Sequence, residues 1–567
     1  METASSISER QGIKKFRVIT LPLSNEIIFV LGCTMAAFLI RFLLISQDSV
    51  IEFDGVYYAT LGERIISGDF YGGISAYWSP LYCFFIGISS PFFQNSESAG
   101  RFVSIVAGTL LIIPVYFLIR DFFGQLPAYF GTILVVIHPM LIRSSLSVMT
   151  EPVYTLIFTT IMLTGWHALR KGKALIFFLT GLLFGSAYLI KPEAIGFVGL
   201  FFVLTLGAKF FRPNLAFRTL LKGYSLLILG FAIFLLPYVG LLHQKTGRWT
   251  ISQKLQNNVA IINEGEGLLK LTDDGQITKR DQLYGDVFET GQQKKPFLPA
   301  SSSIDSLHRN SDIKGNLGIK GDLVRIFYNL RKEVKQSIPE IFPFFYPFVL
   351  IAIIGFFYKP WTRLRTAKEI YLSSFFICTL IGYAATVIET RYLFPIIPIL
   401  ICWIAHGIVG FSDWATKSAS RFLRTNHKLK PIFAQAFTLI VLIASMIFSL
   451  SQEMALDNVE NLPFEEKQAG LWIKNQAKSQ PLIMASSPIV AYYAGAKQIY
   501  VPDEEFSEVL EYAKRKKVNY LIFGNRWIKN TPNAFPPDEQ SFPEEFKLVF
   551  KDEQYPSYKI LVYQLAN

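Results

Sequence analysis

Four ionisable residues lie beside long apolar runs, where a side chain could act on a substrate held at a membrane surface. Two of them are the carboxylates Asp54 and Glu151, and two are the cations Lys191 and Arg391. A carboxylate can accept the proton of a hydroxyl or help to hold a divalent cation, and a cation can neutralise charge that develops on a phosphate. These residues are therefore the first candidates for a chemical site.

Each of these residues also has a purely structural interpretation. Asp54 precedes a helical stretch and could be a helix N-cap, and Glu151 followed by Pro152 is typical of a helix N-terminus. Lys191 and Arg391 could extend to lipid phosphates from the ends of their helices. Position alone favours the structural interpretation of Asp54, Lys191 and Arg391 and does not distinguish the two for Glu151, so the flanking motifs are needed to choose between them.

Apolar runs long enough to cross a bilayer recur through most of the chain. Of its 567 residues 51% are hydrophobic and 17% are charged, and the mean hydropathy is +0.34. About twenty apolar residues cross the hydrocarbon core. The sequence therefore predicts a polytopic α-helical membrane protein with about eleven transmembrane helices. These helices are expected near 26–45, 99–119, 126–142, 152–168, 174–190, 193–209, 223–242, 342–358, 370–388, 392–410 and 431–450.

Basic residues in alternate gaps predict the orientation of these helices. They gather at 10–17, 170–173, 209–222, 359–368 and 417–430. Because Lys and Arg are retained on the cytoplasmic side, the N-terminus is expected in the cytoplasm and the protein in the plasma (inner) membrane. Much of the net charge of +12 is then a topology signal, and nucleic acid is not expected as a partner. Lys191 and Arg391 break this pattern, since they fall at outer helix ends.

The same topology divides the chain into three parts. A cytoplasmic segment, 1–24, precedes a membrane domain, 25–450, whose outer loops are 46–98 and 243–340. The remainder, 451–567, alternates short β-branched runs with helical patterns and ends in two strand-like runs. This pattern predicts a soluble extracytoplasmic α/β domain with a closing antiparallel pair of strands.

The first outer loop carries a set of motifs that resembles a known family. Its residues Asp54, Tyr57, Tyr58, Pro80 and Leu81, followed by Arg101 at the start of the second membrane helix, match in order the corresponding motif of the GT-C class membrane glycosyltransferases. The resemblance is to glycosyltransferase family 39, the PMT-like group of protein O-mannosyltransferases and lipid A aminoarabinose transferases. Further matches are Thr150-Glu151-Pro152, Lys191-Pro192-Glu193 and Glu389-Thr390-Arg391-Tyr392.

The resemblance implies a glycosyltransferase that moves a hexose or pentose from a polyprenyl-phosphate-linked donor to an acceptor hydroxyl at the outer face of the membrane. The acceptor can be a lipid, a protein or a glycan, and membrane lipids surround the protein. Asp54 is the expected general base, and Glu151 is the second catalytic candidate. A divalent cation between carboxylates is left open, and no obligatory metal is expected. Candidates for substrate binding are Tyr57, Tyr58, Tyr82, Lys191, Glu193, Arg391 and Tyr392.

Two other functions compete with this one. A transporter or lipid flippase would usually show internal repeats and charged or broken helices near the bilayer midplane, whereas the ionisable residues here concentrate at outer helix ends. A non-catalytic scaffold would need only an anchor, and about eleven helices exceed that need. The tyrosines of the first loop also suit an interfacial aromatic belt.

Overall fold

The computed structural model of the chain describes residues 23–45, 50–211, 216–252, 345–384, 389–422, 431–456, 462–502, 504–526, 542–555 and 558–566, with residues 327, 330, 331 and 335. Most of the predicted outer loop 243–340 and nearly all of the predicted cytoplasmic segment 1–24 lie outside the described residues.

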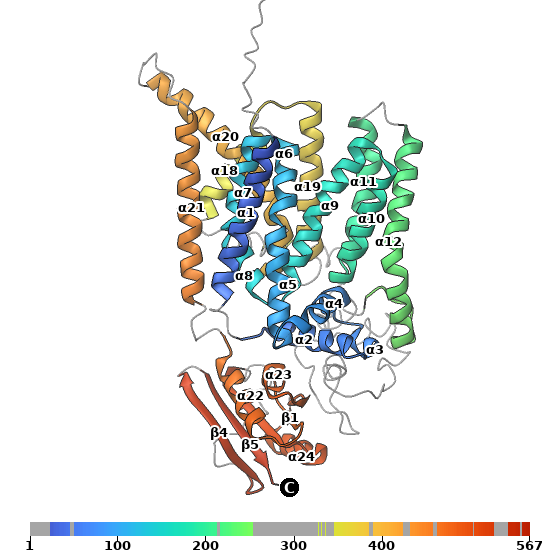
Figure 1. The fold of residues 1–567 in the computed structure, drawn as a ribbon, viewed down its shortest axis with the longest axis vertical. Helices are drawn as coiled ribbons and strands as arrows, with labels where there is room; N and C mark the ends of the chain where they lie inside the picture. The colour runs from blue at the N-terminus through green and yellow to red at the C-terminus, as the bar shows by residue number, and fades with distance from the viewer. Residues whose placement is uncertain are drawn as a thin grey trace, which may run out of the picture.

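Long helices run side by side in a bundle, with the C-terminal domain beyond one of its ends (Figure 1). Each of the eleven predicted apolar segments is helical along most of its length. The helices of the bundle are α1 (Leu23–Leu44), α5 (Ser96–Leu110), α6 (Ile112–Phe123), α7 (Gln125–Val136), α8 (Pro139–Leu146), α9 (Glu151–Lys171), α10 (Ala174–Ile190), α11 (Ala194–Phe211), α12 (Phe217–Thr246), α18 (Phe345–Phe357), α19 (Arg363–Ala384), α20 (Ile397–Phe422) and α21 (Pro431–Leu456).

Fewer helices than eleven meet a length and hydropathy test for a membrane span. In the described part of the chain five do so, or six if the bent pair α7 and α8 counts as one span, so the count of eleven is not confirmed. Four further apolar helices are shorter. The five long spans are Asn25–Leu44, Ser96–Phe123, Phe217–Thr246, Thr390–Arg421 and Pro431–Gln452.

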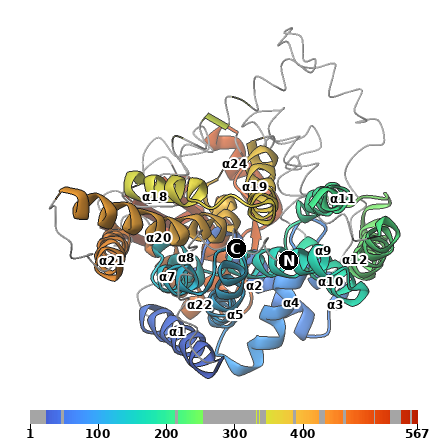
Figure 2. The same ribbon diagram turned by 90° about the horizontal axis from the view of Figure 1, so that it is seen from above.

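The outermost helices present apolar side chains to their surroundings. Viewed from above, α1 and α21 lie at the edge of the bundle (Figure 2). On α1 the side chains of Ile28 and Leu43 are 66% and 71% exposed, and on α21 Phe433 is 70% exposed. An apolar surface this large is stable against lipid rather than water, which agrees with an integral membrane protein.

The basic helix ends share one end of the bundle. The last turns of α9 and α20 carry Arg170, Lys171 and Arg421, and both turns lie opposite the C-terminal domain (Figure 1). The grouping expected from alternate basic gaps is therefore present in these helices. Which end faces the cytoplasm stays a prediction.

Three short helices of the first outer loop lie across the other end of the bundle. They are α2 (Phe53–Ile66), α3 (Phe70–Gly73) and α4 (Pro80–Ser89), and α5 follows after the 3₁₀ turn η2 (Ser90–Phe92). Helices α2 and α4 pack backbone against backbone at a glycine pair, since a Cβ on Gly87 would lie 2.7 Å from the carbonyl oxygen of Gly62. This close contact sets where α2, and Asp54 with it, lies on the bundle.

The C-terminal domain is a five-stranded sheet with strand order β2-β1-β3-β5-β4, and the predicted closing antiparallel pair is β4 with β5. The apolar side chains of its helices and strands form a core that includes Ile473, Ile483 and Val562. One short helix of this domain, α23, was not predicted from the sequence. The elements are α22 (Phe464–Gln476), β1 (Leu482–Met484), α23 (Pro488–Ala494), β2 (Lys497–Ile499), α24 (Phe506–Lys516), β3 (Tyr520–Gly524), β4 (Phe546–Tyr555) and β5 (Tyr558–Leu565).

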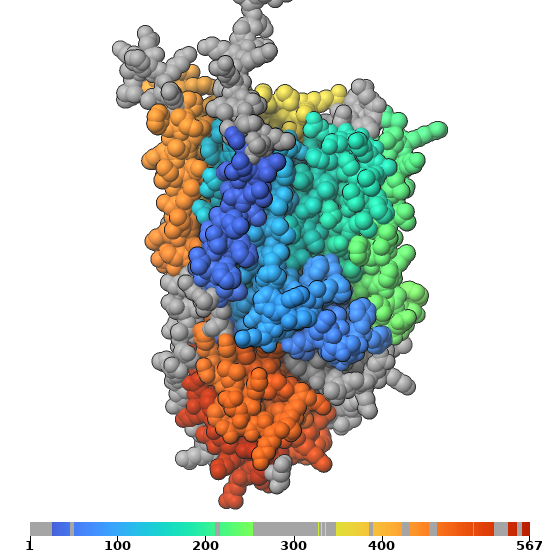
Figure 3. Space-filling model, viewed as in Figure 1, coloured from blue at the N-terminus to red at the C-terminus, as the bar shows by residue number. Residues whose placement is uncertain are grey.

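Hydrogen bonds from tyrosines join the C-terminal domain to the first outer loop, whose helices lie between that domain and the bundle (Figure 3). The hydroxyl of Tyr493 on α23 donates to Glu97 at 2.9 Å and accepts from the backbone N–H of Ile51 at 3.0 Å. The hydroxyls of Tyr57 and Tyr500 also bond to each other. The domain is therefore bonded to the same segment that leads into α2.

Replacing Tyr493 with Phe should loosen this contact. The variant lacks the hydroxyl, so the Glu97 carboxylate and the Ile51 N–H each lose one hydrogen bond. Such a loss lowers the free energy of unfolding by about 1–3 kcal/mol for each buried group. We expect faster hydrogen–deuterium exchange at 50–52 and 488–494. Tyr558→Phe, on β5 away from the contact, is the matched control, and equal exchange in the two variants would contradict the interpretation.

Candidate active site

Asp54 lies in the first turn of α2, and its carboxylate is used for pairing rather than for capping. The N-cap of α2 is Glu52, whose side chain instead accepts a hydrogen bond from the N–H of Val148 at 2.9 Å. The Oδ2 atom of Asp54 lies 2.9 Å from Nη1 of Arg391. The N-cap interpretation of Asp54 is therefore wrong, and the residue forms an ion pair across the site.

Arg391 lies far from Asp54 in the sequence, on the 3₁₀ helix η4 (Thr390–Ile396) between α19 and α20. Its guanidinium pairs with Asp54 and Glu389 together, and Met149 Sδ lies 3.8 Å from Nη1. The side chains of Asp54 and Arg391 are 22% and 29% exposed. The pair is thus partly open to a ligand.

A pocket of about 360 Å³ contains this ion pair. It lies between the start of α2, the end of α8, the segment joining α8 to α9, and η4. Arg143 brings a second guanidinium to the pocket, and Phe394 forms part of its apolar wall. The lining residues are Glu52, Phe53, Asp54, Arg143, Ser144, Ser147, Met149, Glu151, Arg391 and Phe394.

Glu151 and Lys191 form a buried pair at the side of this pocket. Oε1 of Glu151 lies 3.0 Å from Nζ of Lys191, with side-chain exposures of 3% and 6%. The ammonium also lies 4.7 Å from the centre of the Tyr392 ring, over which the Arg391 guanidinium lies at 5.4 Å. Lys191 therefore does not extend to lipid, since its charge is buried in the protein, and both cations lie close to the ring of Tyr392.

Tyr58 is buried on α2 beside these acidic groups. Burial raises the pKa of its hydroxyl well above the usual value, and the negative charges of Asp54 and Glu151 act in the same direction. The phenol accordingly stays protonated at every physiological pH and can only act near these carboxylates as a hydrogen-bonding group.

The structure places the other predicted binding residues outside the pocket. The ring of Tyr57 stacks on Trp78 at 4.7 Å, and its hydroxyl contacts Tyr500 of the C-terminal domain. The hydroxyl of Tyr82 bonds Ser104 at 2.8 Å. Glu193 accepts a hydrogen bond from Tyr383 at 2.9 Å. Each of these side chains is engaged with protein groups next to the site rather than in it.

Arg101, part of the loop-one motif, connects segments behind the pocket. Its guanidinium donates to the carbonyl oxygens of Val50 and Leu146 and pairs with Glu97 at 2.7 Å. Val50 precedes α2 and Leu146 ends α8, so Arg101 holds together two segments that line the pocket.

Sequence reasoning missed Arg143, Met149 and Glu52 as lining residues. One signal could have found Arg143, because it lies at the same end of the bundle as Lys191 and Arg391 and breaks the positive-inside pattern in the same way. Nothing in the sequence distinguishes Glu52 and Met149 from their neighbours.

Within the described residues no three His, Cys, Asp or Glu side chains are grouped as a metal site would require. Asp54 and Glu389 both pair with Arg391, and Glu151 pairs with Lys191. Glu52, which also lines the pocket, accepts a hydrogen bond from the N–H of Val148.

The arrangement of helices defines a class of protein, the GT-C membrane glycosyltransferase fold. ArnT from Cupriavidus metallidurans bound to undecaprenyl phosphate has a TM-score of 0.56 at 13% identity, covering 95% of this chain and 98% of that one. The Archaeoglobus fulgidus oligosaccharyltransferase in the apo form has a TM-score of 0.56 at 13% identity, covering 93% and 73%. The expected GT-C fold is confirmed.

Within that class, one family model matches part of the chain. Residues 78–238 match the family described as dolichyl-phosphate-mannose-protein mannosyltransferase. This region begins just before Pro80 and ends inside α12, so it includes Glu151 and Lys191 but neither Asp54 nor Arg391. No curated protein sequence matches the chain. The resemblance noted in the motifs therefore agrees with both the fold and the family model.

Proposed function

We propose that the chain is a glycosyltransferase that moves a sugar from a polyprenyl-phosphate-linked donor to an acceptor hydroxyl at the outer face of the membrane. The observation that carries this proposal is the partly open Asp54–Arg391 pair in a pocket that also holds Arg143 and Glu151. Transfer of a phosphate-linked sugar to a hydroxyl requires a base that accepts the hydroxyl proton and cations that neutralise the charge left on the phosphate.

In the proposed reaction Asp54 accepts the proton of the acceptor hydroxyl. The hydroxyl oxygen forms a bond to the anomeric carbon while the bond from that carbon to the donor phosphate oxygen breaks. The electron pair leaves on the phosphate, which gains one negative charge. Transfer through this single displacement inverts the configuration of the anomeric carbon.

The cations of the site would meet that charge. Arg391 has a planar guanidinium that suits two phosphate oxygens at once, and Arg143 lines the same pocket. A bound phosphate would compete with Asp54 for Arg391, and the carboxylate would then be available to the acceptor. In this proposal Glu151 keeps Lys191 in place beside Tyr392, and a divalent cation is not an obligatory part of the site.

Ligands of proteins with the same fold support the choice of donor. The ArnT structure holds undecaprenyl phosphate, and an Archaeoglobus fulgidus oligosaccharyltransferase structure holds an inhibitory peptide and dolichol phosphate, with a TM-score of 0.53 at 13% identity, covering 88% of this chain and 69% of that one. We propose the same kind of lipid carrier for this chain, with the N-terminus in the cytoplasm and the C-terminal domain outside.

Deleting the gene for this protein should therefore leave its polyprenyl-phosphate-linked sugar donor unused. We expect membranes of a deletion strain to accumulate a polyprenyl-phosphate sugar, and an envelope molecule to lack one sugar residue, both measurable by mass spectrometry. A plasmid copy should reverse both changes, whereas a copy with Asp54→Asn should reverse neither. Uptake or lipid flipping in proteoliposomes without any sugar transfer would favour a transporter instead.

A further inference from the structure

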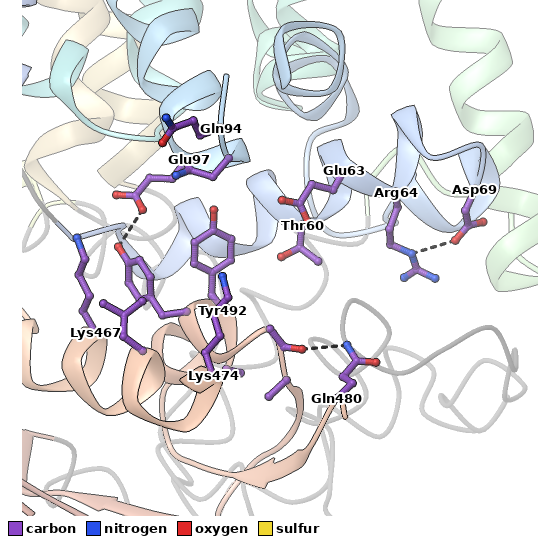
Figure 4. A pocket seen from close by; sticks show the side chains of 16 residues that line it. Thr60, Glu63, Arg64, Asp69, Gln94, Glu97, Lys467, Lys474, Gln480 and Tyr492 are labelled. Carbon is purple, nitrogen blue, oxygen red and sulfur yellow. Dashed lines mark hydrogen bonds and ion pairs between the residues drawn. The ribbon is translucent and has the colours of Figure 1, made fainter. Parts of the chain in front are cut away.

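A second pocket, of about 960 Å³, lies between the first outer loop and the C-terminal domain (Figure 4). One wall comes from α2 and the turn before α5, and the opposite wall comes from α22, α23 and the turns that flank α23. Its volume is at the upper end of the range of about 300–1,000 Å³ for small-molecule sites. The reaction proposed above does not use this pocket.

Hydrogen-bonding groups of both kinds line this second pocket. Lys474 can donate, and the amides of Gln94 and Gln480 can both donate and accept. The carboxylate of Glu63 accepts from Ser96, whose hydroxyl lies 2.9 Å from that of Tyr492, so the two walls are bonded to each other at this point. Among the described residues of the lining, Leu471 is the one large aliphatic side chain.

This lining favours one kind of occupant over others. Sugar hydroxyls donate and accept at once, as the amides do, and a sugar ring can pack against the face of a tyrosine. A lipid acceptor would need an apolar surface, and a peptide would bind most firmly through apolar side chains that enter apolar pockets. Leu471 gives either of them a single aliphatic contact.

We propose that this pocket binds a carbohydrate chain and that this chain is the acceptor, an inference that rests on the proposed glycosyltransferase function. The acceptor is then a glycan with several sugar residues. The inner residues occupy the second pocket, and a hydroxyl of the terminal residue lies at Asp54.

The helix α2 connects the two pockets. Asp54 lines the first and Thr60 lines the second, and six residues along a helix correspond to about 9 Å. Glu97, in the wall of the second pocket, pairs with Arg101, which in turn holds Val50 and Leu146. A glycan bound in the second pocket therefore lies against the same elements that position the catalytic pocket.

The test uses the full-length protein in nanodiscs on an array that carries both oligosaccharides and peptides. We expect the wild type to bind a subset of the oligosaccharides. A Gln94→Ala/Lys474→Ala variant should bind them at least about tenfold more weakly, because it lacks a donor on each wall. The matched control is Gln476→Ala/Lys478→Ala, which removes the same residue types outside the lining and should bind as the wild type does.

A third protein separates this inference from the proposed function. Asp54→Asn protein should bind the oligosaccharides but not transfer sugar to them. Wild-type protein that transfers sugar yet binds no oligosaccharide, or binds peptides instead, would overturn the inference alone. Equal binding by the two double variants would also overturn it. Oligosaccharide binding without any transfer by the wild type would instead overturn the proposed function.

Discussion

Replacing Asp54 with Asn should lower the rate of sugar transfer by about 10²–10⁴-fold, the usual contribution of a general base. Asn has nearly the same shape but cannot take a proton from the acceptor. Its side-chain oxygen can still accept the hydrogen bond from Arg391, which lies 2.9 Å away in the native protein. We therefore expect normal folding and expression with a loss of turnover, measured with a polyprenyl-phosphate sugar in nanodiscs.

A matched control distinguishes loss of the base from loss of one negative charge. Glu508→Gln removes an exposed carboxylate on α24 that lines neither pocket, and it should leave the rate unchanged. Near-normal turnover by the Asp54→Asn protein would show that another group accepts the proton, and Glu151 would be the next candidate.

Replacing Lys191 with Met should reduce stability more than any other single change near the site. The substitution leaves the Glu151 carboxylate, 3% exposed, without the ammonium that lies 3.0 Å away. Loss of one partner of a buried ion pair costs about 3–5 kcal/mol, because the remaining charge is neither paired nor solvated. We expect a lower Tm in detergent and less protein that elutes as a single species.

A double variant separates the two functions that Lys191 can have. Glu151→Gln/Lys191→Met contains no buried charge at this position, and most of the lost stability should return. If Lys191 also meets the donor phosphate, turnover should stay low despite the recovered Tm. Full recovery of both quantities would show that the pair has only a structural role.

The sequence predicted the local structure well because helix formation here depends on local apolar runs. The segment 174–190 was predicted with the bounds that α10 has, and 431–450 lies inside α21. The bend between α7 and α8 was missed, and the bend of 47° before Pro139 is where the predicted span 126–142 is interrupted. A proline there is compatible with a new helix start but not with a continuous helix.

The composition of the site could be predicted only in part. Asp54, Glu151 and Arg391 share one pocket as their motifs suggested. Tyr57 and Tyr82 point elsewhere, because the orientation of a side chain on a short helix depends on packing against Trp78, Ser104 and the C-terminal domain. Such contacts form between residues far apart in the chain, and no short motif reports them.

The separation of Asp54 and Arg391 by 337 residues has a consequence for biogenesis. A nascent chain carries the carboxylate into the membrane early, but the guanidinium is synthesised only after two thirds of the protein has been made. In the proposed function both residues are needed for sugar transfer, so we expect a fragment that ends before η4 to be inactive. We expect activity to appear only after the late helices, which bring Arg391 to Asp54, have been inserted.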